Sequence, residues 1–242
     1  MRVLVIPDIH LKPWIVDRAE EWFNEKTPDA AVFLGDIADD WDKEWNIPLY
    51  NATYDRVIKF CEDHNDRTYV CLGNHDLAYM WGRAVSGTSE YAVTTVKAKI
   101  KELKETLPAG RVAVMQCLDN CLFSHAGLVR CFAEEYVGKK IPPQQIADLV
   151  NIMSKVILWD RNSPLWARPQ GEQTIGSQLA MWPEGVLQVV GHTPTVTVFM
   201  DGDMLTCDTC STYRNGKFIG TPQLIIVDTQ TREIEKFVIV EQ

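Results

Sequence analysis

The sequence has 242 residues, a hydrophobic content of 46%, a mean hydropathy of -0.14 and a formal net charge of -9 at pH 7. This length and apolar content predict one domain spanning residues 1–242. No apolar run approaches the ~18 residues that cross a bilayer, and the acidic balance argues against general nucleic-acid binding, which needs clustered Lys and Arg. We expect no membrane partner and a cytoplasmic location.

The first half of the chain alternates strand-like and helix-like segments. Short apolar runs predict strands, and segments with apolar residues at helical spacing predict the helices between them. In chain order these are strand 2–6, helix 13–23, strand 30–34, helix 54–61, strand 68–72 and helix 91–107. Such alternation is typical of a layered α/β fold with crossover helices.

The second half contains fewer predicted helices and more strands. Apolar runs at 111–115, 121–123 and 186–190 predict strands, with a helix through 146–157. The last segments alternate with period two, over 196–200, 204–207, 223–227 and 233–240. We expect this half to form an antiparallel sheet. Because neither a repeat nor a linker separates the halves, they are interpreted as two layers of one domain.

Five of the apolar runs lead into polar side chains at their C-terminal ends. The segments are Asp8 with His10, Gly35-Asp36, Gly73-Asn74-His75-Asp76, Ser124-His125-Ala126-Gly127 and Gly191-His192-Thr193-Pro194. Ligands of layered α/β folds bind outside the carboxyl ends of the strands, so these five ends are predicted to converge on one site. Four of the five histidines belong to these segments, and the fifth, His64, is interpreted as solvated.

The residue types at these ends are typical of a dinuclear metal centre. Asp8 and His10 would leave the same face of an extended backbone and hold one ion together. Asp36 would bridge to a second ion, which Asn74, His125 and His192 complete. Mixed Asp, Asn and His ligands without thiolate suit Mn, Fe or Zn, with Mn as the first choice.

Two such ions serve the hydrolysis of phosphate esters. They polarise phosphate oxygens and lower the pKa of bound water from ~15.7 towards ~7, which makes a metal-bridging hydroxide the nucleophile. His75 need not bind metal and is predicted to be the general acid for the leaving oxygen. The neighbouring Asp76 is predicted to orient its imidazole.

The motifs also carry a family resemblance over nearly the whole chain. Asp8-Ile9-His10, Gly35-Asp36-Ile37-Ala38-Asp39, Gly73-Asn74-His75-Asp76, His125-Ala126-Gly127 and Gly191-His192-Thr193-Pro194 resemble, in order and spacing, the calcineurin-like metallophosphoesterases. The sequence is most similar to phage and bacterial serine/threonine-type phosphatases and diadenosine-tetraphosphate hydrolases. The resemblance implies two stacked mixed β-sheets flanked by helices, and a metal-dependent phosphatase that hydrolyses phosphomonoesters.

The resemblance also implies one substrate-binding arginine and shows where the chain departs from the family. Ile157-Leu158-Trp159-Asp160-Arg161 resembles the segment that places a phosphate-binding arginine, which assigns that role to Arg161. Asp40 stands where the protein-phosphatase branch has a second arginine, and a carboxylate facing the site there would repel phosphate. Cys210 replaces a usual glycine. Asp39 either holds its loop or contributes to the site.

Two other functions remain open at this stage. A dinucleoside-polyphosphate hydrolase would use the same metal centre but would need a basic and aromatic groove for the rest of the nucleotide. The sequence has five tryptophans near the motifs, which are interpreted as packing residues. They are Trp41, Trp45, Trp81, Trp159 and Trp166. A non-catalytic scaffold should have lost a ligand or the general acid, and this chain retains them all.

Overall fold

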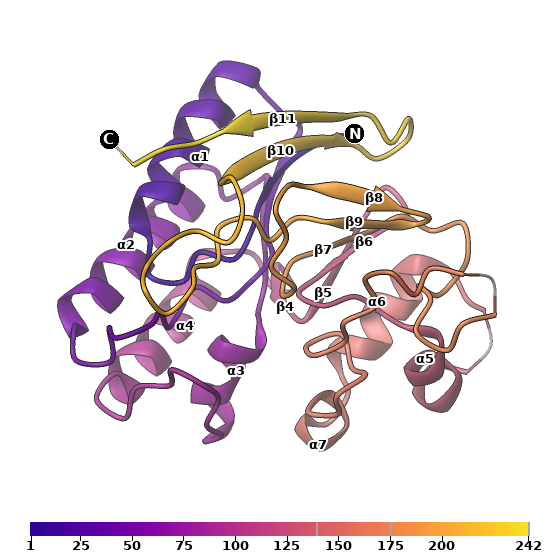
Figure 1. Ribbon diagram of the computed structural model, residues 1–242, viewed down its shortest axis with the longest axis horizontal. Helices are drawn as coiled ribbons and strands as arrows, with labels where there is room; N and C mark the ends of the chain where they lie inside the picture. The colour runs from indigo at the N-terminus through magenta and orange to yellow at the C-terminus, as the bar shows by residue number, and fades with distance from the viewer. Residues whose placement is uncertain (139, 175, 242) are drawn as a thin grey trace.

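The computed structural model describes residues 1–138, 140–174 and 176–241. Its centre consists of two β-sheets packed face to face, with helices on their outer sides (Figure 1). The first sheet has the order β11 (Ile234–Val238), β10 (Gln223–Asp228), β1 (Arg2–Ile6), β2 (Ala30–Phe33), β3 (Thr68–Cys71) and β4 (Val112–Ala113). The second has the order β5 (Met115–Leu118), β6 (Cys121–Ser124), β7 (Gln188–Val190), β9 (Met204–Thr206) and β8 (Phe199–Asp201). The predicted pair of mixed sheets is confirmed.

Strand β1 shows how the apolar runs build the core. Val3 and Val5 belong to the apolar cluster between the two sheets, whereas Leu4 and Ile6 pack on the side of the helices. All four side chains are fully buried, which explains a continuous apolar run in place of alternation. Since β1, β2, β3 and β4 pair in parallel, their carboxyl ends lie at one edge of the sheet.

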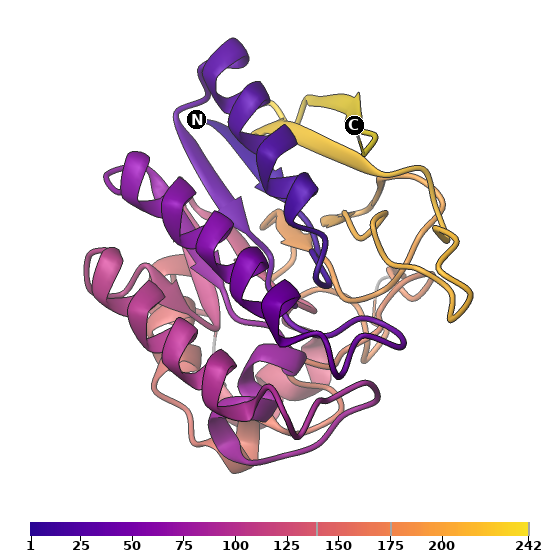
Figure 2. The same ribbon diagram turned by 90° about the vertical axis from the view of Figure 1, so that its left-hand side faces the viewer.

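Helices cover the outer face of the six-stranded sheet. Figure 2 shows α1 (Pro13–Lys26), α2 (Ile47–Asp63) and α4 (Val93–Thr106) side by side in one layer. Helix α1 begins at Pro13, whose fixed φ suits a first helical turn, and buries Ile15, Ala19 and Phe23. The short helix α3 (Asn74–Trp81) follows β3 directly. Beside the other sheet lie α5 (Arg130–Tyr136), α6 (Pro143–Asn151), which packs on β5, and α7 (Lys155–Leu158).

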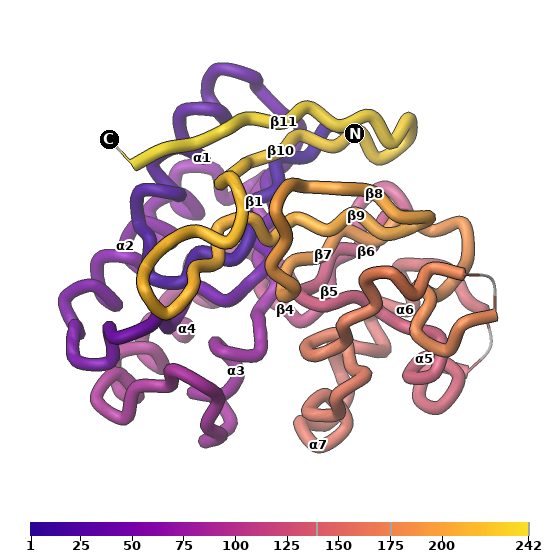
Figure 3. Tube along the Cα trace, viewed as in Figure 1, coloured from indigo at the N-terminus to yellow at the C-terminus, as the bar shows by residue number. Residues whose placement is uncertain are grey.

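The strands of the second half are not arranged as the sequence predicts. The β10–β11 hairpin joins the first sheet, where β10 pairs antiparallel with β1 in the register Val3↔Val227. The tube in Figure 3 places the N-terminus beside this hairpin. In the second sheet β6, β7 and β9 are parallel. The prediction of one antiparallel sheet was therefore wrong, because period-two patterning indicates which side chains are buried and not which strands pair.

His64 is buried, and the prediction that it is solvated was wrong. Its Nε2 lies 3.0 Å from Oε1 of Glu20, and its ring packs against Phe23 and Phe60. His64 caps the C-terminal end of α2, and because α2 packs on α1, its ring lies against Glu20 and Phe23, an arrangement that the polar segment around it does not reveal. Among the described residues, no helix is both long and apolar enough to span a membrane.

Candidate metal centre

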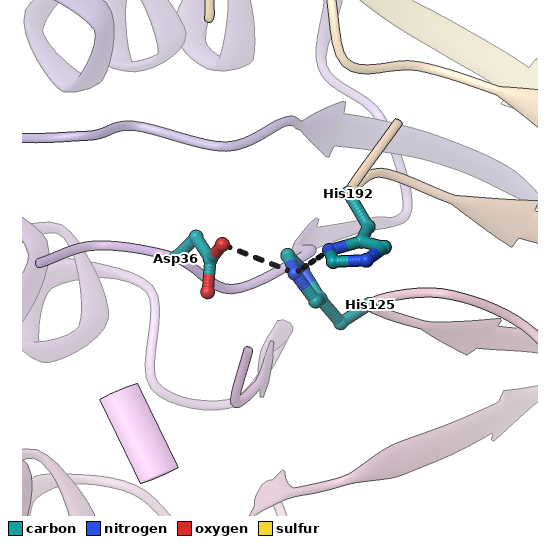
Figure 4. Close-up of side chains that lie close together, drawn as sticks. All are labelled: Asp36, His125 and His192. Atoms are coloured by element: carbon teal, nitrogen blue, oxygen red, sulfur yellow. Dashed lines mark hydrogen bonds and ion pairs between the residues drawn. The ribbon is translucent and has the colours of Figure 1, made fainter. Parts of the chain in front are cut away.

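The five polar segments converge at one edge of the two sheets, as predicted. Two groups of side chains there have ligand atoms that all lie within 4.8 Å of one another. The first group is Asp8, His10 and Asp36, and the second is Asp36, His125 and His192. Asp36 is common to both. Figure 4 shows its carboxylate and the two imidazoles of the second group pointing toward one another.

Glycines in two of the motifs make room for the carboxylates. A Cβ atom on Gly73 would lie 2.1 Å from Oδ1 of Asp36, and one on Gly191 would lie 2.1 Å from Oδ2 of Asp8. Any larger residue at either position would displace a carboxylate from the centre. These close approaches explain why a glycine precedes Asn74 and His192 in the two motifs.

Three candidate ligands have left-handed backbone conformations. His10, Asp36 and His192 have φ values of 44°, 48° and 62°, a region that residues other than glycine rarely adopt. The expectation that Asp8 and His10 share a face of an extended backbone was wrong, because β1 ends at Ile6 and the chain then turns. The turn still brings both side chains into the first group. Such strained positions are typical of functional sites.

Two histidines are oriented like metal ligands. His125 Nδ1 lies 2.9 Å from the Leu34 carbonyl oxygen, and His10 Nδ1 lies 2.8 Å from the Asp39 carbonyl oxygen. Each Nδ1–H therefore donates to the backbone and orients Nε2 toward the site, as in most histidines that bind metal. His125 Nε2 faces Oδ1 of Asn74 at 2.9 Å and Oδ2 of Asp36 at 3.1 Å.

The charged groups at this site are crowded together and mostly buried. Burial, and then the charge of Asp208, raise the pKa of Asp8 well above its usual value. Burial lowers the pKa of a histidine, but Asp36 and Asp8 outweigh it at His125 and raise its pKa to about 9. The pKa of Asp36 is lowered, because the His125 and His75 charges outweigh its burial.

These residues fit divalent cations. Burial and the His125 charge hold the pKa of His192 well below its usual value, so its imidazole is neutral at pH 7. Its Nδ1 faces Nε2 of His125 at 3.0 Å, and its buried Nε2 has no hydrogen-bond partner among the described residues. A neutral imidazole whose Nδ1 faces the other candidate ligand atoms, beside buried carboxylates, is a donor set that Mn, Fe and Zn accept.

His75 is oriented by Asp39 and not by Asp76. Its Nδ1 lies 2.9 Å from Oδ2 of Asp39, and Oδ1 of Asp39 accepts hydrogen bonds from the hydroxyls of Tyr50 and Tyr79. Burial lowers the pKa of His75, but the carboxylates of Asp36 and Asp39 outweigh it, so its pKa is raised. The sequence signal for this role was that Asp39 ends the motif Gly35-Asp36-Ile37-Ala38-Asp39.

The role predicted for Asp76 was therefore wrong. Asp76 occupies the third position of α3, and its Oδ2 accepts from the Gly73 N–H at 3.0 Å, which caps the helix. Its Oδ1 accepts from the N–H groups of Ile37 and Ala38, at 3.1 and 3.3 Å, and from the Tyr54 hydroxyl at 3.0 Å. Asp76 holds the loop that carries Asp36 against the start of α3.

We expect Asp76→Ala to lower the free energy of unfolding by ~3 to 5 kcal/mol, because it leaves buried donors without an acceptor. Urea unfolding followed by tryptophan fluorescence measures this loss. Asp76→Asn retains one acceptor oxygen and should lose less. If Asp76→Ala instead kept the stability of the wild type but lost turnover, the catalytic role first predicted for Asp76 would be supported.

Asp208 is a site residue that sequence reasoning missed. Its carboxylate is buried and accepts hydrogen bonds from the N–H and the hydroxyl of Ser211, at 3.0 and 2.7 Å. Its negative charge contributes to the raised pKa of Asp8. Like the other motifs, Asp208 follows a strand that ends at this edge, here β9, and that position was the signal available in the sequence.

A cavity of about 420 Å³ opens beside the metal-binding groups. Its polar lining includes His10, Asp36, Asn74, His75 and His192. Trp41, Trp159 and Trp166 also line it, so these three are wall residues and not only packing residues, whereas Trp45 and Trp81 are not in the lining. Such a mixture of apolar walls and convergent polar groups is typical of a ligand site.

The arginine at this cavity is Arg168 and not Arg161. Both arginines are exposed, but Arg161 does not line the cavity. Arg168 does, and its Nη1 donates to the His192 carbonyl oxygen at 3.2 Å and to Oγ1 of Thr193 at 3.3 Å. The sequence contained a signal for this alternative, because Leu165-Trp166-Ala167-Arg168 repeats the Leu-Trp-x-Arg pattern of the segment that ends at Arg161.

Several solved structures are similar to this chain, and one of them supports the same architecture. A protein serine/threonine phosphatase from Saccharomyces cerevisiae, with similarity to human phosphatase PP5, aligns with a TM-score of 0.59 and 16% identity, covering 100% of this chain and 81% of its own. A putative diadenosine tetraphosphatase aligns with a TM-score of 0.49 and 16% identity, covering 98% of this chain and 93% of its own. A novel archaeal phosphodiesterase aligns with a TM-score of 0.44 and 16% identity, covering 99% of this chain and 100% of its own. At 16% identity, the likeness to the yeast phosphatase shows a shared fold alone.

Family membership rests on the sequence. The comparison with curated proteins found no match. A profile of the family described as calcineurin-like phosphoesterase matches residues 1–214, well over half of the 242 residues. The chain therefore belongs to the calcineurin-like phosphoesterases, a family of metal-dependent hydrolases that act on phosphoester bonds.

Proposed function

We propose that this protein is a phosphatase that hydrolyses phosphomonoesters with two divalent ions. Asp8, His10 and Asp36 hold one ion, and Asp36, Asn74, His125 and His192 hold the other. The observation that carries the proposal is that Asp36 belongs to both ligand groups. Mn is the first choice of metal, with Fe and Zn as alternatives.

Residues near the two ion positions are proposed to donate the proton to the leaving oxygen and to orient the donor. Divalent ions bound by these residues would supply Lewis acidity toward the phosphate and would lower the pKa of water, so that hydroxide is available near neutral pH. Asp39 holds the imidazole of His75 through Nδ1, which leaves Nε2–H to protonate the leaving oxygen. The carboxylates of Asp36 and Asp39 outweigh burial and raise the pKa of His75, which favours the protonated imidazole.

Arg168 is proposed to bind the phosphate oxygens in place of Arg161. Its guanidinium lies at the cavity wall beside His192, and a planar fork of donors suits a phosphate dianion. We expect Arg168→Ala to raise KM and to lower kcat/KM by ~10- to 100-fold, as for loss of a charge-assisted hydrogen bond. Steady-state kinetics on p-nitrophenyl phosphate measure the effect.

Arg161→Ala is the matched control for this prediction. It removes the same side chain from an exposed position seven residues earlier and should leave kcat/KM within twofold. If Arg161→Ala caused the larger loss, the assignment from the sequence resemblance would be right and the one from the cavity wrong.

A dinucleoside-polyphosphate hydrolase remains the second candidate, and one observation favours it. Two of the cavity tryptophans have a guanidinium over the ring, with Arg214 5.3 Å from the Trp41 centroid and Arg83 5.8 Å from the Trp159 centroid. Aromatic faces beside cations suit a nucleobase and additional phosphates. Arg83 and Arg214 do not line the cavity themselves but lie against tryptophans that do, and this partial match to a basic and aromatic groove favours the second candidate.

A panel of three substrates separates the candidates. Metal-loaded protein is assayed on p-nitrophenyl phosphate, a phosphoserine peptide and diadenosine tetraphosphate. We expect kcat/KM to be highest on a monoester. A value for the dinucleotide that exceeds both monoesters by two orders of magnitude would replace the first candidate by the second. No turnover of any phosphoester would support a non-catalytic scaffold.

A further inference from the structure

Asp40 forms a partly buried ion pair at the wall of the cavity. Its Oδ2 lies 3.0 Å from Nζ of Lys12, and the two side chains are only 15% and 9% exposed. Asp40 lines the cavity at the position where the related protein phosphatases carry an arginine for phosphate, whereas Lys12 lies behind it. A lone carboxylate here would repel a phosphate, but this one is paired with a cation.

Further hydrogen bonds fix both members of the pair. Oδ1 of Asp40 accepts from the Trp41 N–H at 2.9 Å and from the hydroxyl of Thr212 at 3.0 Å. Lys12 also donates to the carbonyl oxygen of His10 at 3.1 Å. The pair therefore joins the loops that follow β1, β2 and β9, and neither charge is free to turn toward solvent or substrate.

We propose that the Lys12–Asp40 pair sets the charge that the cavity presents to the substrate, and with it the preference between phosphomonoesters and phosphodiesters. Intact, the pair has no net charge, so the wall discriminates little between a dianion and a monoanion. Removing either partner leaves one unit of charge, which acts more strongly on the dianion. The inference rests on the proposed phosphoesterase activity and adds a specificity determinant to it.

The test measures a ratio that is insensitive to the amount of active protein. At pH 8 a monoester is a dianion, because its second pKa is ~6, and a diester is a monoanion. For each variant, kcat/KM is measured on p-nitrophenyl phosphate and on bis(p-nitrophenyl) phosphate, which share a leaving group. The variants are Asp40→Asn, Lys12→Met and the double variant Lys12→Met with Asp40→Asn.

We expect the ratio of monoester to diester to follow the charge of the pair. It should rise roughly three- to tenfold in Asp40→Asn, fall by a similar factor in Lys12→Met, and return to within twofold of the wild type in the double variant. The inhibition constant of inorganic phosphate should fall in Asp40→Asn and rise in Lys12→Met. This second readout decides the question when only one ester is turned over.

Lys59→Met is the control for overall charge. It changes net charge by the same unit at an exposed pair with Asp63 on α2, away from the cavity, and should leave the ratio unchanged. Lys12→Met leaves a buried carboxylate unpaired and is the variant at risk of unfolding. If Lys12→Met does not fold, Asp40→Asn and the double variant still test the inference. The ratio of monoester to diester kcat/KM must rise in Asp40→Asn and return to the wild-type value in the double variant.

Two outcomes would overturn the inference in distinguishable ways. If both single variants lowered turnover of the two esters equally and left phosphate inhibition unchanged, the pair would be structural only, while the proposed activity stood. If the folded, metal-loaded wild type turned over neither ester nor diadenosine tetraphosphate, the proposed function would fail and the inference with it.

Discussion

His75→Ala should lower kcat by ~10² to 10⁴-fold and leave the metal content of the protein unchanged. His75 belongs to neither ligand group, and its Nδ1 is bonded to Asp39, so its removal takes away a proton donor and not a ligand. Turnover of metal-loaded protein and elemental analysis of the same sample test both halves of the prediction.

The leaving group provides a sharper readout of this role. The loss should be smallest for p-nitrophenyl phosphate, whose leaving group needs little protonation, and largest for alkyl phosphates such as a phosphoserine peptide. Asp39→Asn keeps the shape of the partner but removes its charge, and we expect a smaller loss with the same dependence on leaving group. If His75→Ala emptied the site of metal, His75 would be a ligand and not the acid.

The assignment of Asp39 and Asp76 shows why neighbours in sequence can be poor partners in space. Asn74, His75 and Asp76 form the first turn of α3, where successive side chains point ~100° apart. Asp76 therefore turns back to the N–H of Gly73 and cannot face His75. The Gly-x-x-Asp spacing of Gly73 and Asp76 is a helix-capping pattern and does not indicate a catalytic pair.

The positions of the candidate metal ligands were easier to predict than those of the candidate substrate-binding residues. Asp8, Asp36, His125 and His192 follow apolar strands, and strand ends in a layered fold meet at one edge whatever the details of the loops. Arg161 and Arg168 instead lie on an irregular segment after α7, where nothing in the spacing decides which of two Leu-Trp-x-Arg segments faces the cavity. Loop conformation, and with it substrate contact, depends on long-range packing.

Pairing of the last strands was unpredictable for a similar reason. The apolar residues of β10 are buried, as are those of β1, so both strands suit the centre of a sheet. Their sequences do not say that they pair with each other across more than 200 residues. The sequence therefore predicted the layers and the strand ends but not the membership of each sheet.

Asp36→Ala should cause the largest loss of bound metal of any single substitution at the centre. Because Asp36 is shared by both ligand groups, its removal takes one oxygen ligand from each and leaves two cations without a carboxylate between them. We expect bound metal to fall from two ions to one or fewer, and kcat/KM to fall by at least ~10³-fold. Elemental analysis after gel filtration in Mn and titration calorimetry measure the two effects.

Comparison with two other substitutions makes this result specific to the shared position. His192→Ala removes a ligand from one group only and should leave one tightly bound ion, since Asp8, His10 and Asp36 remain together. Asp39→Asn removes another buried carboxylate charge of the same cavity that belongs to neither group, and should keep both ions. If Asp36→Ala retained two ions, or if Asp39→Asn lost them as readily, a carboxylate other than Asp36 would join the two ions and the proposed centre would have to be redrawn around it.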